Sequence, residues 1–141
     1  MPTNVEIEIE NRMAEYDRIS SALDGFVSKN ALSDDTGFSL QLVAEEIVTN
    51  IIKYAFKDKA AHIIKFEVAI EGKTVHLRFS DDGAEFNPFN APAPDISLPI
   101  EKRPVGGLGL HLVRSLCETV RYSRQDGRSI IDLHLKIKRR I

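Results

Sequence analysis

Three groups of polar or glycine residues interrupt otherwise apolar segments of the sequence, and each could take part in chemistry. Glu46 and Asn50 are four residues apart, which places their side chains on one face of a helix. Residues 81–86 (DDGAEF) follow an alternating, strand-like run, and residues 106–109 (GGLG) enter an apolar segment of helical pattern. Taken one at a time, the three groups have ordinary explanations: a solvated helix flank, an Asp-Gly turn and a tight loop.

The glycine-rich stretch at residues 106–109 would suit an anion. Each glycine at a helix start costs about 0.5–1 kcal/mol of backbone order relative to alanine, so a close approach to the backbone is a reason to keep it. The first N–H groups of a helix are unpaired and lie at the positive end of its dipole. The stretch therefore predicts a phosphate-binding turn around Gly107, Leu108 and Gly109.

The other two groups have chemistry that complements a phosphate. Asn50 carries a side-chain oxygen, a ligand type that Mg²⁺ prefers beside phosphates. Asp81 can accept a hydrogen bond from the exocyclic amine of adenine, where guanine has a carbonyl oxygen, and Gly83 lets a ligand approach the backbone. Glu46 lies one helical turn before Asn50 and could take a proton from an attacking hydroxyl group. Its neighbour Glu45 leaves open which carboxylate would do so.

The periodicity of apolar residues predicts the elements that position these groups. The first half of the chain favours a strand at residues 5–9, a helix at 13–26 and a second helix from about 38 to 55, after N-cap candidates at 33–36. The second half favours strands at 62–70 and 74–80, a helix from 108 to about 118, and strands at 119–124 and 129–138. This order favours an α+β two-layer sandwich, with helices on one face of a mainly antiparallel mixed sheet, and a single domain over residues 1–141.

Five prolines lie between Pro88 and Pro104 and exclude a regular helix or a central strand there. An irregular segment of this length is usually functional in a small domain, so we expect a lid. Lys102 and Arg103 could cover phosphate charge from it.

The bulk properties exclude several classes of protein. The formal net charge of −2 gives no overall field for nucleic acid, so no direct nucleic-acid partner is expected. No apolar run approaches the roughly 18 residues that span a bilayer, which predicts a cytoplasmic protein without a membrane partner. Cys117 is the only cysteine, and its apolar helical context predicts a buried, inert thiol.

The order of the three groups resembles the GHKL family of ATP-binding domains. The pattern Glu-x-x-x-Asn is found at residues 46–50, Asp-x-Gly-x-x-Phe at 81–86 and Gly-x-Gly at 107–109, with the proline-rich segment between the last two. Within that family, residues 44–56 (AEEIVTNIIKYAF) resemble nearly throughout a helix of the small bacterial anti-sigma-factor serine kinases. The resemblance covers about residues 5–138 and implies a Bergerat-type fold.

The resemblance implies an ATP- and Mg²⁺-dependent protein serine kinase that regulates transcription by phosphorylating a small, STAS-like anti-sigma-factor antagonist. It also allows a sigma factor as a second partner, and a homodimer. The implied catalytic residue is Glu46, the implied metal ligand is Asn50, and the implied ATP contacts are Asn50, Asp81, Gly83, Phe86, Gly107, Leu108 and Gly109. A non-catalytic, nucleotide-dependent binding switch and a simple ATPase are the alternatives. A sensor histidine kinase is disfavoured because none of the four histidines lies in a separate upstream dimerisation helix.

Overall fold

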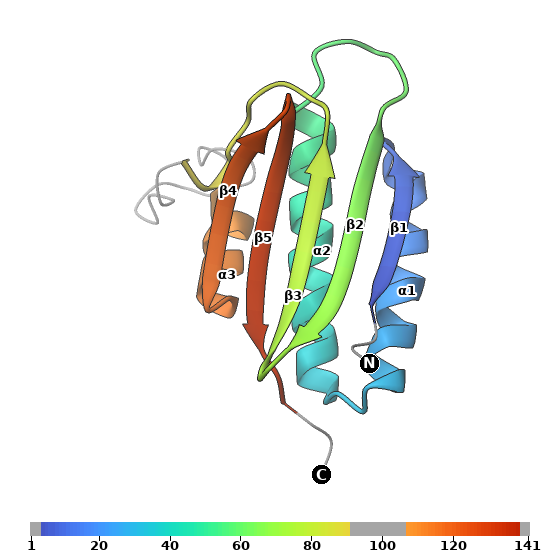
Figure 1. Ribbon diagram of the computed structural model, residues 1–141, viewed down its shortest axis with the longest axis vertical. Helices are drawn as coiled ribbons and strands as arrows, with labels where there is room; N and C mark the ends of the chain where they lie inside the picture. Colours follow the sequence, from blue (N-terminus) through green and yellow to red (C-terminus); the bar gives the residue numbers. More distant parts are fainter. Residues whose placement is uncertain (1–3, 91–106, 139–141) are drawn as a thin grey trace.

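The computed structural model describes residues 4–90 and 107–138, which form a five-stranded sheet with helices packed against one face (Figure 1). The strands are β1 (Val5–Glu10), β2 (Ile63–Glu71), β3 (Thr74–Asp81), β4 (Thr119–Gln125) and β5 (Arg128–Lys136). The α-helices are α1 (Tyr16–Lys29), α2 (Asp34–Tyr54) and α3 (Gly107–Leu116), and the short 3-10 helices are η1 (Met13–Glu15) and η2 (Pro88–Asn90). The expected two-layer α+β sandwich is confirmed.

The strand order across the sheet is β1-β2-β3-β5-β4. All four pairings are antiparallel, so the parallel pairing that a mixed sheet would include does not occur among the described strands. β5 follows the other strands in the chain but lies inside the sheet, between β3 and β4. This position places Asp81, at the end of β3, directly opposite Ser129 of β5.

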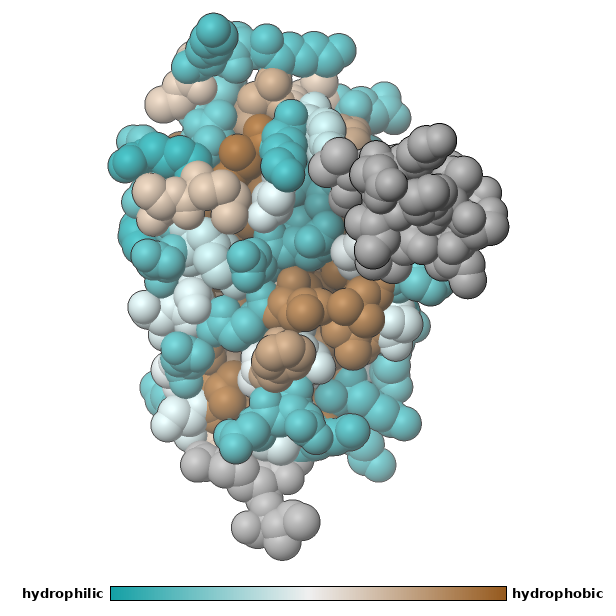
Figure 2. Space-filling model, turned by 180° about the vertical axis from the view of Figure 1, so that it is seen from behind, coloured by the Kyte–Doolittle hydropathy of each residue, from teal (hydrophilic) through white to brown (hydrophobic). Residues whose placement is uncertain are grey.

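The core lies between the sheet and the helices because apolar and polar residues alternate along the strands. On the helix-facing side, Phe66, Phe79 and Leu133 are almost completely buried, and α2 contributes Ile47 and Ile51. The outer surface of the helix layer is mostly hydrophilic, with apolar residues gathered near its centre (Figure 2). No helix of the described residues covers the opposite face of the sheet, which carries polar side chains of β2, β3 and β5 (Figure 1).

α2 begins at Asp34, four residues earlier than the sequence predicted. The cause is the N-cap residue Ser33, whose Oγ accepts a hydrogen bond from the Thr36 N–H at 3.1 Å. Gly37 lies within the first turn and faces Val27 of α1. The first helix also differs slightly, since residues 13–15 form η1 and α1 starts at Tyr16.

The start of α2 is tied to the chain after β5. The Ser33 N–H donates to the Lys138 carbonyl oxygen at 2.7 Å, and the Lys138 N–H donates to Thr36 Oγ1 at 3.0 Å. These bonds join residues about one hundred positions apart and fix the helix against the end of the sheet.

Residues 91–106, which include most of the expected lid with Lys102 and Arg103, lie outside the described residues. Within the described part, none of the helices is long and apolar enough to cross a membrane.

Candidate active site

Asn50 and Glu46 interact directly on one face of α2. The Asn50 side chain is 3% exposed, and its Nδ2 donates to the Glu46 carbonyl oxygen at 2.8 Å and to Glu46 Oε1 at 3.1 Å. The described residues give no hydrogen bond to Asn50 Oδ1. The amide therefore holds the carboxylate with its nitrogen and keeps its oxygen available for a ligand.

The neighbouring carboxylates Glu45 and Glu46 have different surroundings. Successive residues of a helix are rotated by about 100°, and this rotation leaves Glu45 exposed while Glu46 is half-buried beside Asn50. The sequence left open which of the two carboxylates would act as the base. The structure favours Glu46, because Glu46 is the one that lies beside Asn50.

Gly109, in the first turn of α3, lies against the Glu46 side chain. A Cβ atom placed on Gly109 would collide with both carboxylate oxygens of Glu46 and with the carbon between them. The sequence predicted that this glycine makes room for a phosphate, which remains a prediction, whereas the structure shows that it makes room for Glu46. Gly107 and Leu108 are the first two residues of the same helix, so the unpaired N–H groups of its first turn belong to the same turn as Gly109, which lies against Glu46.

Asp81 lies at the end of β3 and is 1% exposed. The Gly83 N–H donates to its Oδ1 at 2.8 Å, and this is the only hydrogen bond that the described residues make to the carboxylate. Burial raises the pKa of the Asp81 carboxyl above its usual value, although the Gly83 N–H opposes this shift. The second carboxylate oxygen is therefore an acceptor available to a ligand amine.

Gly83 is required by the contact between the β3 end and the α2 end. A Cβ atom on Gly83 would lie 2.6 Å from the Ala55 carbonyl oxygen, which itself accepts a hydrogen bond from the Ala84 N–H at 2.8 Å. The segment carrying Asp81 is thereby fixed to the helix that carries Asn50. One helix thus connects the two groups of predicted site residues.

Phe86 joins this region through Tyr54 and Tyr122. The Phe86 and Tyr54 rings are 5.4 Å apart at an angle of 43°, and the Phe86 N–H donates to the Tyr122 hydroxyl at 3.2 Å. Arg124 donates from Nη1 to the Gly83 carbonyl oxygen at 3.1 Å and to Ser129 Oγ at 2.9 Å.

Tyr122, Arg124 and Ser129 were not identified from the sequence. Only the pairing of β4 with β5, and of β5 with β3, brings them to residues 81–86. No local sequence motif around these three residues indicates that they lie close to residues 81–86.

The structure therefore groups the predicted residues at the end of the sheet where α2 ends and α3 begins (Figure 1). A buried carboxylate, a buried amide oxygen and the start of a helix are groups that bind an adenine amine, a cation and a phosphate, respectively. A family model described as the histidine kinase-like ATPase domain matches residues 9–135. The chain belongs to this family. The GHKL resemblance and its implied fold are confirmed.

Serine-protein kinases are among the relatives of this histidine kinase-like ATPase domain. The serine/threonine-protein kinase BtrW of Bordetella bronchiseptica is 31% identical over 90 residues, which cover 64% of this chain and 63% of BtrW. The serine-protein kinase RsbW of Listeria monocytogenes is 28% identical over 119 residues (78% and 73%), and RsbW of Bacillus cereus is 22% identical over 135 residues (90% and 81%). The match to BtrW thus spans under two thirds of that protein.

A solved structure has the same fold. It contains the RsbU and RsbW domains of Rv1364c from Mycobacterium tuberculosis, and it matches with a TM-score of 0.70 at 13% identity. The match covers 98% of this chain and 33% of that one, so the likeness is to one part of a longer protein.

Proposed function

We propose that this protein is an ATP-dependent protein serine kinase that phosphorylates a small, STAS-like anti-sigma-factor antagonist. The observation that carries the proposal is the position of the Glu46 carboxylate, which is held by the Asn50 amide and lies against Gly109 at the start of α3. Binding of a nucleotide alone does not need a carboxylate beside the phosphate turn. The names of the relatives as serine-protein kinases support the same reaction.

In this proposal the buried polar groups bind ATP. Asp81 accepts from the adenine amine with the oxygen that Gly83 does not occupy, and the first turn of α3 donates N–H groups to the phosphates. Asn50 Oδ1 fits a Mg²⁺ ion, because it is an amide oxygen without a donor from the described residues. When bound, the ion would neutralise charge on the phosphates.

Glu46 acts on the partner's serine. The carboxylate takes the hydroxyl proton while the serine oxygen forms a bond to the γ-phosphorus, the bond from that phosphorus to the bridging oxygen breaks, and ADP leaves. The hydrogen bond from Asn50 Nδ2 fixes one carboxylate oxygen, and the other is available for the proton.

The test compares Glu46→Gln with Glu45→Gln, a matched control one residue away that is exposed in the structure. Each protein is incubated with radiolabelled Mg-ATP and a purified antagonist from the same genome, and nucleotide affinity is measured in parallel. We expect Glu46→Gln to bind Mg-ATP almost normally and to transfer phosphate about 10²–10⁴-fold more slowly. Glu45→Gln should behave like the wild type, and equal labelling by Glu46→Gln would remove Glu46 from the mechanism.

Asn50→Ala separates the metal site from the base. This variant should bind Mg-ATP more weakly and also transfer phosphate more slowly, because Asn50 Oδ1 would hold the metal ion in both steps. If the wild type binds ATP tightly but labels no antagonist, a non-catalytic nucleotide-dependent switch replaces the kinase.

A further inference from the structure

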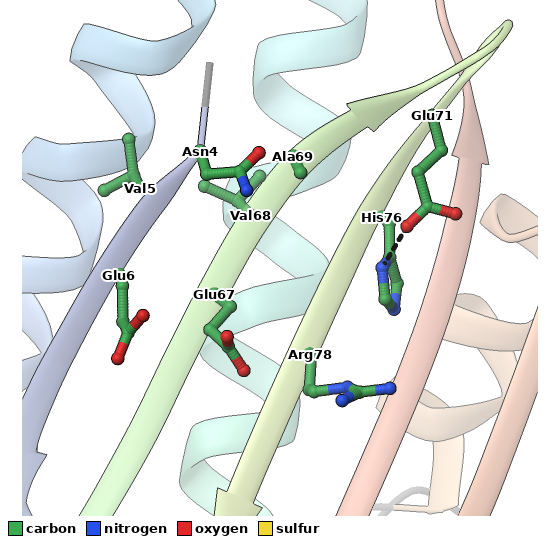
Figure 3. A pocket seen from close by; sticks show the side chains of 9 residues that line it. All are labelled: Asn4, Val5, Glu6, Glu67, Val68, Ala69, Glu71, His76 and Arg78. Atoms are coloured by element: carbon green, nitrogen blue, oxygen red, sulfur yellow. Dashed lines mark ion pairs between the residues drawn. The ribbon is translucent and has the colours of Figure 1, made fainter. Parts of the chain in front are cut away.

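The open face of the sheet carries a cluster of two histidines and a glutamate at the end opposite Asp81. His76 of β3 and His134 of β5 lie directly opposite each other in the strand register, and their rings stack at 4.5 Å with 7° between the planes. Glu71, at the end of β2, extends over the same position, where Figure 3 shows its carboxylate facing the His76 ring. The helices cover the other face, so the cluster is separate from the candidate active site.

One nitrogen of each histidine lies close to the Glu71 carboxylate. The Glu71 carboxylate lies 2.5 Å from His76 Nδ1 through Oε2 and 3.3 Å from His134 Nε2 through Oε1. One ligand atom from each of the three residues can be chosen so that all lie within 4.8 Å of one another. Two imidazoles and one carboxylate are therefore close enough together to form a candidate metal-binding group.

The remaining nitrogen of each ring is held by another side chain. Asp132 Oδ1 lies 2.6 Å from His76 Nε2, and Thr119 Oγ1 lies 2.9 Å from His134 Nδ1. Asp132 is itself fixed by Arg78, whose Nε donates to it at 2.7 Å. Partners of this kind orient metal-binding histidines, because a hydrogen bond at one nitrogen sets the tautomer and leaves the other nitrogen for the ion.

We propose that Glu71, His76 and His134 form a binding site for a divalent transition-metal ion of the zinc type, oriented by Asp132 and Thr119. Imidazole nitrogens suit zinc, copper and nickel, whereas Mg²⁺ and Ca²⁺ prefer oxygen ligands alone. Two histidines and one glutamate are a ligand set of zinc sites that keep a fourth position for water. A cavity of about 240 Å³ adjoins Glu71 and His76 on the side of β1 and β2, and His134 does not line it.

Binding requires a rearrangement of the three side chains. Ligand atoms about 2.0 Å from a tetrahedral ion lie roughly 3.3 Å apart, whereas the three candidate ligand atoms lie within 4.8 Å of one another. Glu71 can supply part of the movement, because its side chain is half exposed and it precedes the turn between β2 and β3. The planes of the two imidazoles are 7° from parallel, so one ring must also turn before a lone pair of each ring can reach the same ion.

The experiment titrates the nucleotide-free protein with Zn²⁺ by calorimetry and with Co²⁺ by visible absorption, which reports tetrahedral coordination. The wild type should bind one equivalent and develop the cobalt absorption. His76→Ala, His134→Ala and Glu71→Gln should each lose that absorption, and Asp132→Asn should bind about 10–100-fold more weakly. Thermal unfolding by circular dichroism checks that each variant is folded, with His134→Gln as a milder replacement if His134→Ala is not.

His62→Ala is the matched control. His62, like His76, contacts two carboxylates through opposite ring nitrogens, Nδ1 to Asp82 and Nε2 to Asp58, but the described residues bring no third metal-ligating side chain to either contact. It should bind Zn²⁺ like the wild type. The proposal is overturned if the wild type binds no stoichiometric ion, if the His76 and His134 variants retain wild-type affinity, or if His62→Ala loses as much affinity as they do.

Discussion

The carboxylate of Glu46 on α2 occupies the space that a Cβ atom at Gly109 on α3 would need. Two helices that are far apart in the chain therefore meet at the side chain proposed as the catalytic base and at one glycine. The contact sets where the carboxylate stands relative to the first turn of α3.

Gly109→Ala should separate the position of Glu46 from the stability of the fold. Alanine favours the helix by up to about 1 kcal/mol, but the added methyl group must displace the carboxylate or the helix. A displacement near 1 Å can reduce catalysis about 10²-fold, so we expect a loss of this size in phosphate transfer.

Gly25→Ala is the control for Gly109→Ala, because nothing lies within 4 Å of a Cβ at this position of α1. It should stabilise the protein by about 0.5–1 kcal/mol and leave transfer unchanged. Wild-type transfer by Gly109→Ala would show that the contact does not position Glu46.

Asp81→Asn should lose ATP affinity without losing stability. The asparagine amide can present a donor to the adenine amine, and an unsatisfied buried pair costs about 1–3 kcal/mol. Titration with a fluorescent ATP analogue measures this loss, and near wild-type affinity would exclude Asp81 as the adenine acceptor.

The stability of the wild type, compared with this variant, has a predicted pH dependence. Burial raises the pKa of Asp81 in the folded state above its ordinary value of 3.8, so the folded protein holds this proton more tightly than the unfolded chain. Ionised Asp81 therefore lowers stability as pH rises from near 3.8 through the raised value. At pH 7, Asp81→Asn should resist urea at least as well as the wild type, and a clear destabilisation would contradict the assignment of the shift to burial.

His62 should make stability depend on pH near neutrality. The hydrogen bond to Asp58 Oδ1 at 2.7 Å, opposed by partial desolvation and helped by Asp82, raises the pKa of His62 above 6.5. The contribution of protonated His62 to the free energy of unfolding is fully present below pH 6.5 and is lost as the pH rises through the raised pKa. An NMR titration of the imidazole should show the raised value, and Asp58→Asn should lower it, whereas an unchanged His62 titration in that variant would remove Asp58 as the main cause.

Cys117 should react slowly with iodoacetamide in the folded protein. Burial raises the pKa of its thiol to about 12, so little of the reactive thiolate forms at pH 8. Since it is the only cysteine, mass spectrometry of native and urea-unfolded protein measures one adduct. Equal rates in the two states would show that the thiol is accessible.

Much of the fold was predictable because its elements are encoded locally. The alternation in β1 to β5 and the spacing of apolar residues in α2 identify type and approximate length without tertiary information. The predicted start of α2 was four residues late, because several residues at 33–36 could cap a helix and only the structure shows that Ser33 is the one that does.

The site was predictable only where one short segment carries it. Glu46 with Asn50, and Asp81 with Gly83, interact within a few residues of sequence. The contact of Glu46 with Gly109 depends on helix packing. The pairing of His76 with His134 depends on which strand lies beside β3, and the spacing of residues along the chain does not reveal that neighbour.

The place of β5 inside the sheet has a consequence for synthesis on the ribosome. Every other strand of the fold emerges first, yet β3 and β4 have no hydrogen-bonding partner between them until β5 arrives. The bonds from Ser33 and Thr36 to Lys138 form later still. Synthesis proceeds at about 5–20 residues per second, so the edge of β3 waits seconds for its partner, and we expect a product that lacks β5 to be a substrate for proteases.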